Sequence, residues 1–171
     1  MTARRRFFSH VALPLAGSLA VSLAGCGFAL RRAPELRFRT LQLTGFQPRS
    51  PLADALRRTI DSSTTTLVVD TLAQAQVVLE AVEDMRSKVV VAINSVGEVT
   101  EFQLRERFSF RLRSVAGREL IPTTSILLNR DLSYTESAAL GKEQEEAFLY
   151  RAMQSDIVAQ VLRRLASVET F

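Results

Sequence analysis

The alternation of apolar and polar residues predicts three long strands in the second half of the chain. The clearest pattern runs from 102 to 113, and two similar period-two patterns cover 76–93 and 120–134. Short turns at 94–97 and 116–117 separate the three segments, so we expect an antiparallel meander. One face of the central strand carries five apolar residues, and the opposite face carries Gln103, Arg105, Arg107, Ser109, Arg111 and Arg113.

Acidic residues interrupt two of these apolar rows. Glu83 and Ser87 break the row of 76–93, which consists of Val77, Leu79, Ala81, Met85, Val89, Val91 and Ile93. Glu106 falls among the apolar residues of the central strand. The sequence offers no explanation for Glu83, and for Glu106 it offers only an internal pairing with an arginine.

The first half of the chain predicts a strand, a helix and a short edge strand. Residues 36–46 have a strand pattern in which Phe38 is out of phase, which indicates a bulge or a later start. Ser50 can cap a helix whose first turn contains Pro51. Residues 67–70 can form a short edge strand. The apolar face of the helix consists of Leu52, Ala55, Leu56 and Ile60.

A long helix is predicted over 138–166. Its apolar stripe is broad, and acidic residues near its start and arginines near its end match the helix dipole. The stripe consists of Leu149, Met153, Ile157, Val161 and Leu165, with Tyr150, Val158 and Leu162 beside it. We therefore expect an α+β fold, a two-layer sandwich with both helices on one face of a mostly antiparallel sheet of about four strands. The arginine row lies on the other face, which makes that face a candidate for binding.

The N-terminal segment has the order of a bacterial export signal: three arginines at 4–6, an apolar run over 11–24, and then Leu23-Ala24-Gly25-Cys26. A transmembrane anchor needs about 20 apolar residues, and this run is shorter and is broken by Pro14 and Gly17. An ordinary secretory signal usually ends in an A-x-A-like site. The last four residues resemble the lipobox of bacterial lipoproteins.

This resemblance implies that Cys26 is acylated and that residues 1–25 are removed. The predicted organisation is a signal peptide at 1–25, a lipid-anchored linker at 26–34 and one domain at 35–171. Gly27 follows the cysteine where an aspartate would signal retention in the inner membrane. By analogy with lipoprotein sorting, we expect the protein on the periplasmic side of the outer membrane.

Composition then excludes several functions. Removing the signal leaves 19 basic and 18 acidic residues, so neither charge nor compartment supports nucleic acid as a partner. It also removes His10, the only histidine, while Cys26 is the only cysteine. Ser-His-Asp and Cys-His catalysis, zinc sites built from His or Cys, and an internal disulfide are thereby excluded. We expect neither a metal nor a cofactor, and no enzymatic activity.

Several local motifs resemble the LptE (RlpB) family of lipopolysaccharide-assembly lipoproteins. After the lipobox they are Gly-Phe-x-Leu-Arg at 27–31, Glu-Phe-Gln-Leu at 101–104, Gly-Arg at 117–118 with Leu120, and Leu-Gly-Lys-Glu at 140–143 with Glu146. The resemblance covers essentially all of 26–165. It implies a non-enzymatic protein that plugs the LptD β-barrel in a 1:1 complex, helps to assemble it, and contacts lipopolysaccharide during its insertion into the outer leaflet.

The resemblance assigns a functional role to only a few residues of this chain. Cys26 matches the acylation site, and Lys142 matches a lysine implicated in lipopolysaccharide contact. The family's other basic candidate lies in a turn where this chain has Ser95, Val96 and Gly97. The alternative for Lys142 is a lysine at the helix start that faces water.

We also hypothesise that Arg105, Arg107, Arg111 and Arg113 meet lipid phosphates or acidic residues of the barrel. The alternative is a solvated arginine face that keeps the sheet soluble and prevents pairing with other sheets. A rival function is a lipoprotein scaffold or binding module for another envelope component, without lipopolysaccharide contact.

Overall fold

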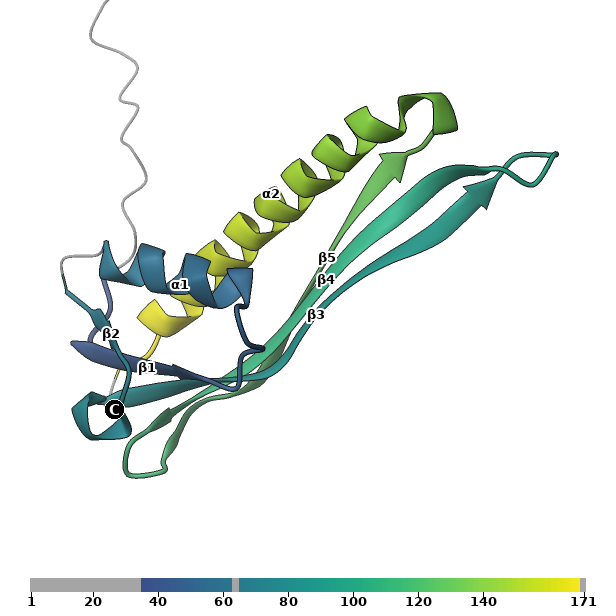
Figure 1. Cartoon of the computed structure of the whole chain (residues 1–171). Helices are drawn as coiled ribbons and strands as arrows, with labels where there is room; N and C mark the ends of the chain where they lie inside the picture. The colour runs from purple at the N-terminus through teal and green to yellow at the C-terminus, as the bar shows by residue number, and fades with distance from the viewer. Residues whose placement is uncertain (1–34, 63–64, 170–171) are drawn as a thin grey trace, which may run out of the picture. The chain divides into compact units, whose positions relative to one another are not determined.

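A computed structural model describes residues 35–62 and 65–169 of the chain. Cys26, the predicted signal peptide at 1–25 and the predicted linker at 26–34 lie outside the described residues. The fold is α+β, as predicted, with a sheet in the order β2-β1-β3-β4-β5 and both helices over one face (Figure 1). The strands are β1 (Thr40–Thr44), β2 (Leu67–Val69), β3 (Val77–Ile93), β4 (Val99–Ser114) and β5 (Glu119–Ser133). The helices are α1 (Pro51–Asp61) and α2 (Ala139–Ala166), and single 3-10 turns, η1 (Leu72–Gln74) and η2 (Glu136–Ala138), precede β3 and α2.

The sheet is mixed. β1 runs parallel to both β2 and β3, whereas β3, β4 and β5 form the predicted antiparallel meander. The short segment predicted near 67–70 is the edge strand β2, so the sheet has five strands rather than about four. β1 begins only at Thr40, and Phe38 is fully buried before it, so the out-of-phase residue reflects a late start. Pro122 lies in the other edge strand, β5, where the register shifts.

Most of the apolar interior lies between the helices and one half of the sheet. We call this cluster the proximal core. Phe108 stacks on Phe110 and on Phe46, with ring centroids 5.5 and 5.7 Å apart. The predicted helix faces supply Leu52, Leu56, Ile60, Ile157, Val161 and Leu165, and the strands supply Leu41, Val77, Leu79, Phe108, Phe110, Leu112, Ile121 and Ile126.

A second, smaller cluster lies further along β4 and nearer the start of α2. This distal core consists of Leu104, Leu132 and Met153, with Phe102, Leu128, Leu149 and Tyr150 partly buried against it. The first half of α2 leaves Leu140 and Phe148 exposed. The apolar stripe predicted for α2 is therefore buried along its second half and only partly covered along its first half.

The predicted apolar row of 76–93 is wrong beyond Ala81. A register shift between Ala81 and Glu83 leaves Val82 as an extra residue, and the residues that follow it exchange faces. Asp84, Arg86 and Lys88 consequently pair across from Phe108, Glu106 and Leu104 on the helix face. Met85 and Val89 lie on the opposite face, beside Arg107 and Gln103. Among the described residues, no helix is both long and apolar enough to cross a membrane.

Candidate functional site

The four arginines of β4 lie on the helix-free face of the sheet, and their environments differ. Nε and Nη2 of Arg111 donate to the Glu80 carboxylate at 3.1 and 2.7 Å, and Arg113 lies 3.8 Å from the same carboxylate. The hydrogen bond from Arg111 lowers the pKa of Glu80. These two arginines therefore have an acidic partner within the sheet, on the neighbouring strand β3.

The other two arginines form no hydrogen bond to a described carboxylate. Arg107 is 3.9 Å from Glu83, and Nε of Arg105 donates to the side-chain oxygen of Gln103 at 2.8 Å. Among the described carboxylates, none lies within ion-pair distance of Arg105. The strand register places Arg107 between Met85 and Leu127, which are 57% and 50% exposed. We call Arg105, Arg107, Met85 and Leu127 the distal arginine patch.

Lys142 is partly exposed at the surface and has two hydrogen-bond partners. Its ammonium donates to Ser133 Oγ at 3.0 Å and to Glu145 Oε2 at 2.8 Å, and its side chain is 19% exposed. The bond to Ser133 connects the first turn of α2 to the end of β5. Because α2 covers the face opposite the arginines, Lys142 and the arginine row do not form one site.

The predicted internal pairing of Glu106 is present, and its partner is Arg86 of β3. Nε and Nη2 of Arg86 both donate to Glu106 Oε1 at 3.4 Å, and Glu106 is fully buried. Desolvation raises the pKa of Glu106, although the charge of Arg86 opposes that effect. The pair lies on β3 and β4 between Phe108 of the proximal core and Leu104 of the distal core.

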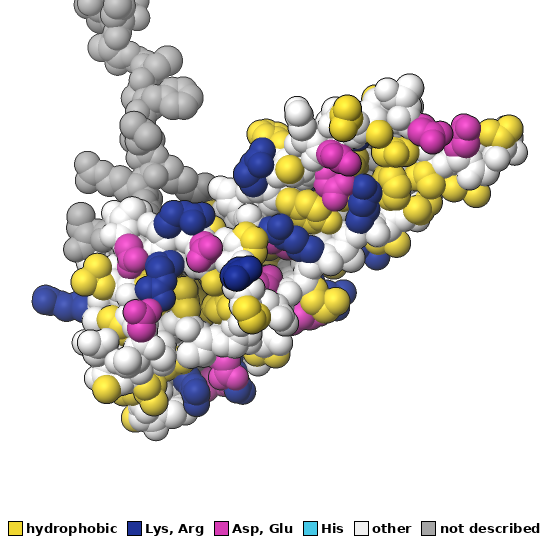
Figure 2. All heavy atoms as spheres, in the orientation of Figure 1, with side chains coloured by type: hydrophobic (Ala, Val, Ile, Leu, Met, Phe, Trp, Pro, Cys, Tyr) yellow, Lys and Arg dark blue, Asp and Glu magenta, His cyan; other side chains and the backbone are white. Residues whose placement is uncertain are grey.

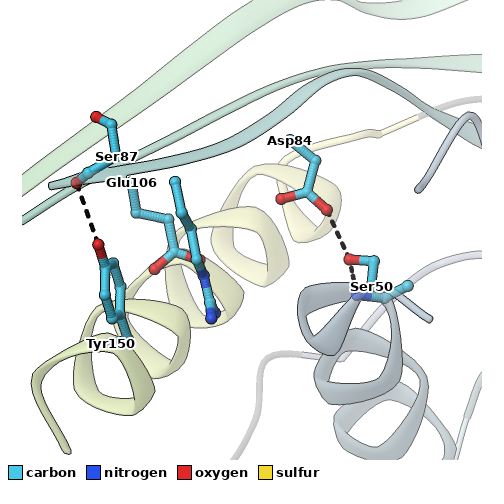
Figure 3. A network of polar contacts seen from close by, with 7 residues as sticks. Ser50, Asp84, Ser87, Glu106 and Tyr150 are labelled. Atoms are coloured by element: carbon cyan, nitrogen blue, oxygen red, sulfur yellow. Dashed lines mark hydrogen bonds and ion pairs between the residues drawn. The ribbon is translucent and has the colours of Figure 1, made fainter. Parts of the chain in front are cut away.

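Polar contacts from both helices converge on the same part of β3. Ser50 Oγ accepts the Ala53 backbone amide at 3.2 Å and donates to Asp84 at 2.6 Å, so the predicted cap of α1 is also bonded to the sheet. Figure 3 shows this contact and the one made by Tyr150 of α2. The Tyr150 hydroxyl donates to the Ser87 carbonyl at 3.1 Å.

The ring of Tyr150 also lies next to the buried ion pair. The Arg86 guanidinium is 4.9 Å from the centre of this ring, a cation–π geometry. Burial raises the pKa of the Tyr150 hydroxyl. The contacts of Arg86, Ser87 and Tyr150 thus hold the middle of α2 against β3.

A hollow of about 610 Å³ opens between α2, β3 and the start of α1. Figure 2 shows acidic and basic side chains side by side over this part of the surface. Lys88 spans one side of it, donating to Glu146 at 2.6 Å, with its ammonium 4.2 Å from the centre of the Phe102 ring. We call it the α2–β3 hollow, and its lining consists of Pro51, Arg86, Lys88, Glu143, Glu146, Ala147, Tyr150, Arg151 and Gln154.

Sequence reasoning missed this hollow. The predicted apolar row of 76–93 continued through the bulge at Val82, which left Arg86 and Lys88 out of the face that meets the helices. The spacing of Asp84, Arg86 and Lys88, three charged residues in period two, was the available signal. In the described part of the chain, no group of three Asp, Glu, His or Cys side chains is placed to hold a metal ion.

Comparison with known proteins extends the resemblance. Residues 38–165 match the family model described as "LptE: Lipopolysaccharide-assembly". The LPS-assembly lipoprotein LptE of Photorhabdus laumondii is 28% identical over 167 residues, which cover 93% of this chain and 87% of that protein. The corresponding protein of Pectobacterium atrosepticum is 26% identical over 167 residues, covering 96% and 88%.

Solved structures agree with the family match. The uncharacterized lipoprotein B of Nitrosomonas europaea has a TM-score of 0.70 and 31% identity, covering 83% of this chain and 92% of that one. The rare lipoprotein B of Shewanella oneidensis has a TM-score of 0.63 at 21% identity, covering 77% and 96%, and supports the fold alone. The chain therefore belongs to the LptE family.

Proposed function

We propose that this protein is an outer-membrane lipoprotein of lipopolysaccharide assembly. In this role it plugs an LptD-like β-barrel in a 1:1 complex, helps that barrel to assemble, and contacts lipopolysaccharide during insertion into the outer leaflet. The observation that carries the proposal is the family match over residues 38–165, supported by relatives named for lipopolysaccharide assembly. The role is non-enzymatic, in keeping with a mature chain that lacks histidine.

Anchoring at the membrane is assigned to Cys26. Each buried methylene of an acyl chain contributes about 0.8 kcal/mol, so several chains hold a protein far more firmly than one. The linker at 26–34 is short enough to keep the domain near the membrane surface. Mass spectrometry of the mature protein should find acyl groups on Cys26, and Cys26→Ser should release the protein from the outer-membrane fraction. A wild-type protein found free of lipid would contradict this assignment.

The arginine row is assigned a binding role, centred on the distal arginine patch. Arginine binds phosphates and carboxylates through two parallel hydrogen bonds. This requires guanidinium N–H groups that are not already bonded to a carboxylate of the same protein. Arg111 donates twice to Glu80, and Arg113 lies 3.8 Å from the same carboxylate. Arg105 and Arg107 form no hydrogen bond to a described carboxylate, although Arg107 lies 3.9 Å from Glu83. We therefore propose that the distal pair contacts lipid phosphates or acidic barrel residues, and that the proximal pair mainly stabilises the pairing of β3 with β4.

Double variants test this division. Arg105→Gln with Arg107→Gln should weaken lipopolysaccharide binding or co-purification with the barrel by about tenfold, the size of one lost charge-assisted contact. Arg111→Gln with Arg113→Gln is the matched control on the same strand face and should change either measurement less than twofold. If a quadruple Arg→Gln variant still co-purifies with its barrel and binds lipopolysaccharide normally, the arginine face has no binding role.

Lys142 is proposed as a second, separate contact with lipopolysaccharide. Lys142→Glu should weaken lipopolysaccharide binding without unfolding the domain, because the bonds to Ser133 and Glu145 lie at the surface. Lys142→Arg retains the charge and should bind nearly as well. Equal binding by the wild type and the Lys142→Glu variant would leave the lysine as a structural link between α2 and β5.

Crosslinking in cells separates the proposed function from its rival. A photo-reactive residue on the arginine face should form an adduct with a very large, heat-modifiable barrel. An adduct to a different envelope protein, together with no retention of lipopolysaccharide on purification, would instead favour the scaffold lipoprotein.

A further inference from the structure

Exposed apolar side chains gather at the proximal end of the sheet, opposite the tip of the β3–β4 hairpin. Leu67 begins β2, Leu72 begins η1, and Val115 lies in the turn between β4 and β5; they are 60%, 53% and 50% exposed. Figure 1 shows η1, the β4–β5 turn and the start of β1 at this same end. Exposed apolar side chains that lie together, unlike single ones, indicate an interaction surface.

Hydrogen bonds show that these residues are neighbours across the end of the sheet. The Leu67 amide donates to the Arg39 carbonyl at 2.9 Å, and the Val115 amide donates to the Gln76 carbonyl at 3.3 Å. Gln76 joins the two contacts, because its side-chain oxygen accepts the Arg39 amide at 2.7 Å. One continuous row therefore runs from β2 to the β4–β5 turn, and Leu72 lies four residues before Gln76 in the 3-10 turn beside it.

Three exposed arginines border these apolar residues. Arg37 and Arg39 precede β1, and Arg118 lies at the end of the β4–β5 turn. None of the three guanidinium groups forms a hydrogen bond or ion pair with another described residue. Glu35 and Glu119, also exposed, are the nearest acidic residues along the chain, so the five side chains together carry one net positive charge. We call the combined surface the proximal rim; it consists of Arg37, Arg39, Leu67, Leu72, Val115 and Arg118.

The position of the predicted lipid anchor indicates what this end meets. Glu35, the first described residue, lies five positions before the start of β1. The predicted linker of nine residues, 26–34, spans at most roughly 30 Å when fully extended. By contrast, β3 has 17 residues and carries the hairpin tip about 55 Å from this end. An acyl anchor at Cys26 therefore keeps the proximal rim within reach of the membrane surface, whereas the hairpin tip can lie well beyond it.

We propose that the proximal rim is a membrane contact, which seats the domain on the phospholipid headgroups of the leaflet that holds the acyl anchor. Leu67, Leu72 and Val115 enter the boundary between headgroups and acyl chains, and the three arginines bond to lipid phosphates. A second copy of the chain fits less well, because β2 is an edge of three residues, too short to extend another sheet. The inference rests on the proposed anchoring at Cys26, and it needs no barrel.

The test uses the full acylated chain, reconstituted into vesicles of phosphatidylethanolamine and phosphatidylglycerol. Acylation blocks the thiol of Cys26, so Val115→Cys introduces a single site for an environment-sensitive fluorophore. Its emission should be at least twofold higher on vesicles than in a soluble form of the same labelled chain that carries Cys26→Ser. A phospholipid with a nitroxide group should quench it. The matched control is Val96→Cys in the hairpin turn, whose label should show neither change.

Variants of the rim test whether its own side chains make the contact. Leu67→Ser with Leu72→Ser should remove at least half of the rise in emission at position 115. Leu140→Ser with Phe148→Ser, which replaces two exposed apolar residues of α2, is the matched control and should leave the rise unchanged. Replacing the three rim arginines by glutamine should also remove at least half of it. All these positions are exposed, so the midpoints of urea denaturation should match that of the wild type.

Three results overturn the inference while the acyl anchor stands. Equal emission from labels at positions 115 and 96 would show that the rim stays in water. A rise that Leu67→Ser with Leu72→Ser does not reduce would show that the anchor alone brings the label to the bilayer. A rise that the nitroxide lipid does not quench, and that grows with the density of protein on the vesicles, would assign the rim to contacts between copies. Failure of the acylated chain to associate with vesicles would reject the anchoring at Cys26 and the inference with it.

Discussion

The two halves of the domain differ in how they are held together. The proximal core buries twenty apolar residues from four of the five strands, both helices and their flanking segments, whereas the distal core fully buries three. The distal half compensates with polar links, such as Lys88 to Glu146 and Tyr150 to Ser87, and it exposes apolar side chains near the tip of the β3–β4 hairpin. Stability therefore resides mainly in one half, and the other half presents surfaces that are available to partners.

Removing one large side chain from each core tests this comparison most strongly. Phe108 and Leu104 are both fully buried on the helix face of β4, one in each core. Phe108→Ala should lower the free energy of unfolding by about 3–5 kcal/mol, and Leu104→Ala by about 2–3 kcal/mol, because the smaller core can collapse around the cavity. Urea denaturation of both variants gives the two values. A larger loss from Leu104→Ala would reverse the assignment of the stable half.

Two glycines test the same difference between the proximal and distal halves through the backbone. Gly45 and Gly97 both have positive φ, +78° and +87°. A Cβ at Gly45 would collide with the carbonyl oxygen of Ala81, next to the bulge of β3, while a Cβ at Gly97 in the hairpin turn meets open space. Gly97→Ala should cost about 1 kcal/mol, the penalty of the left-handed conformation alone, and Gly45→Ala about 3 kcal/mol. Equal midpoints of urea denaturation for the Gly45→Ala and Gly97→Ala variants would show that β1 can shift away from Ala81.

Sequence patterns predicted the proximal half well. Strict alternation located β4, the Ser50 cap located the start of α1, and helical spacing located the buried half of α2. These signals are local, since each depends on residues within one element. The parallel pairing of β1 with β2 and β3 is a long-range arrangement, and nothing in the period of those segments specifies it.

The candidate sites were less predictable. The arginine row could be placed on one face from its period, but which of its arginines pair with a carboxylate, and how closely, depends on the residues of β3 that lie opposite. One extra residue, Val82, decides that register and also turns Arg86 and Lys88 toward α2. The α2–β3 hollow is consequently invisible to any analysis that continues one strand phase through the bulge.

The smallest expected effect is a pH dependence of the free energy of unfolding, caused by the buried Glu106–Arg86 pair between the two cores. Desolvation raises the pKa of Glu106 above its ordinary value of 4.5, so the folded state binds its proton more tightly than the unfolded state does. Stability linked to Glu106 is therefore full below pH 4.5 and is lost as the pH rises through the folded pKa. Glu106→Gln should abolish that loss and raise the free energy of unfolding at pH 8.

Glu80 provides a control of opposite sign in the proximal half. The hydrogen bond from Arg111 lowers its pKa, so its contribution is present above pH 4.5 and is lost as the pH falls through the folded pKa. Glu80→Gln should therefore reduce the change in the free energy of unfolding at acidic pH. Glu106→Gln should reduce the change in the same free energy toward neutral pH. Urea denaturation between pH 3 and pH 8 gives both profiles. If Glu106→Gln instead destabilised the protein at pH 8, the ion pair with Arg86 would outweigh the desolvation of the carboxylate, and the layer between the two cores would be a source of stability.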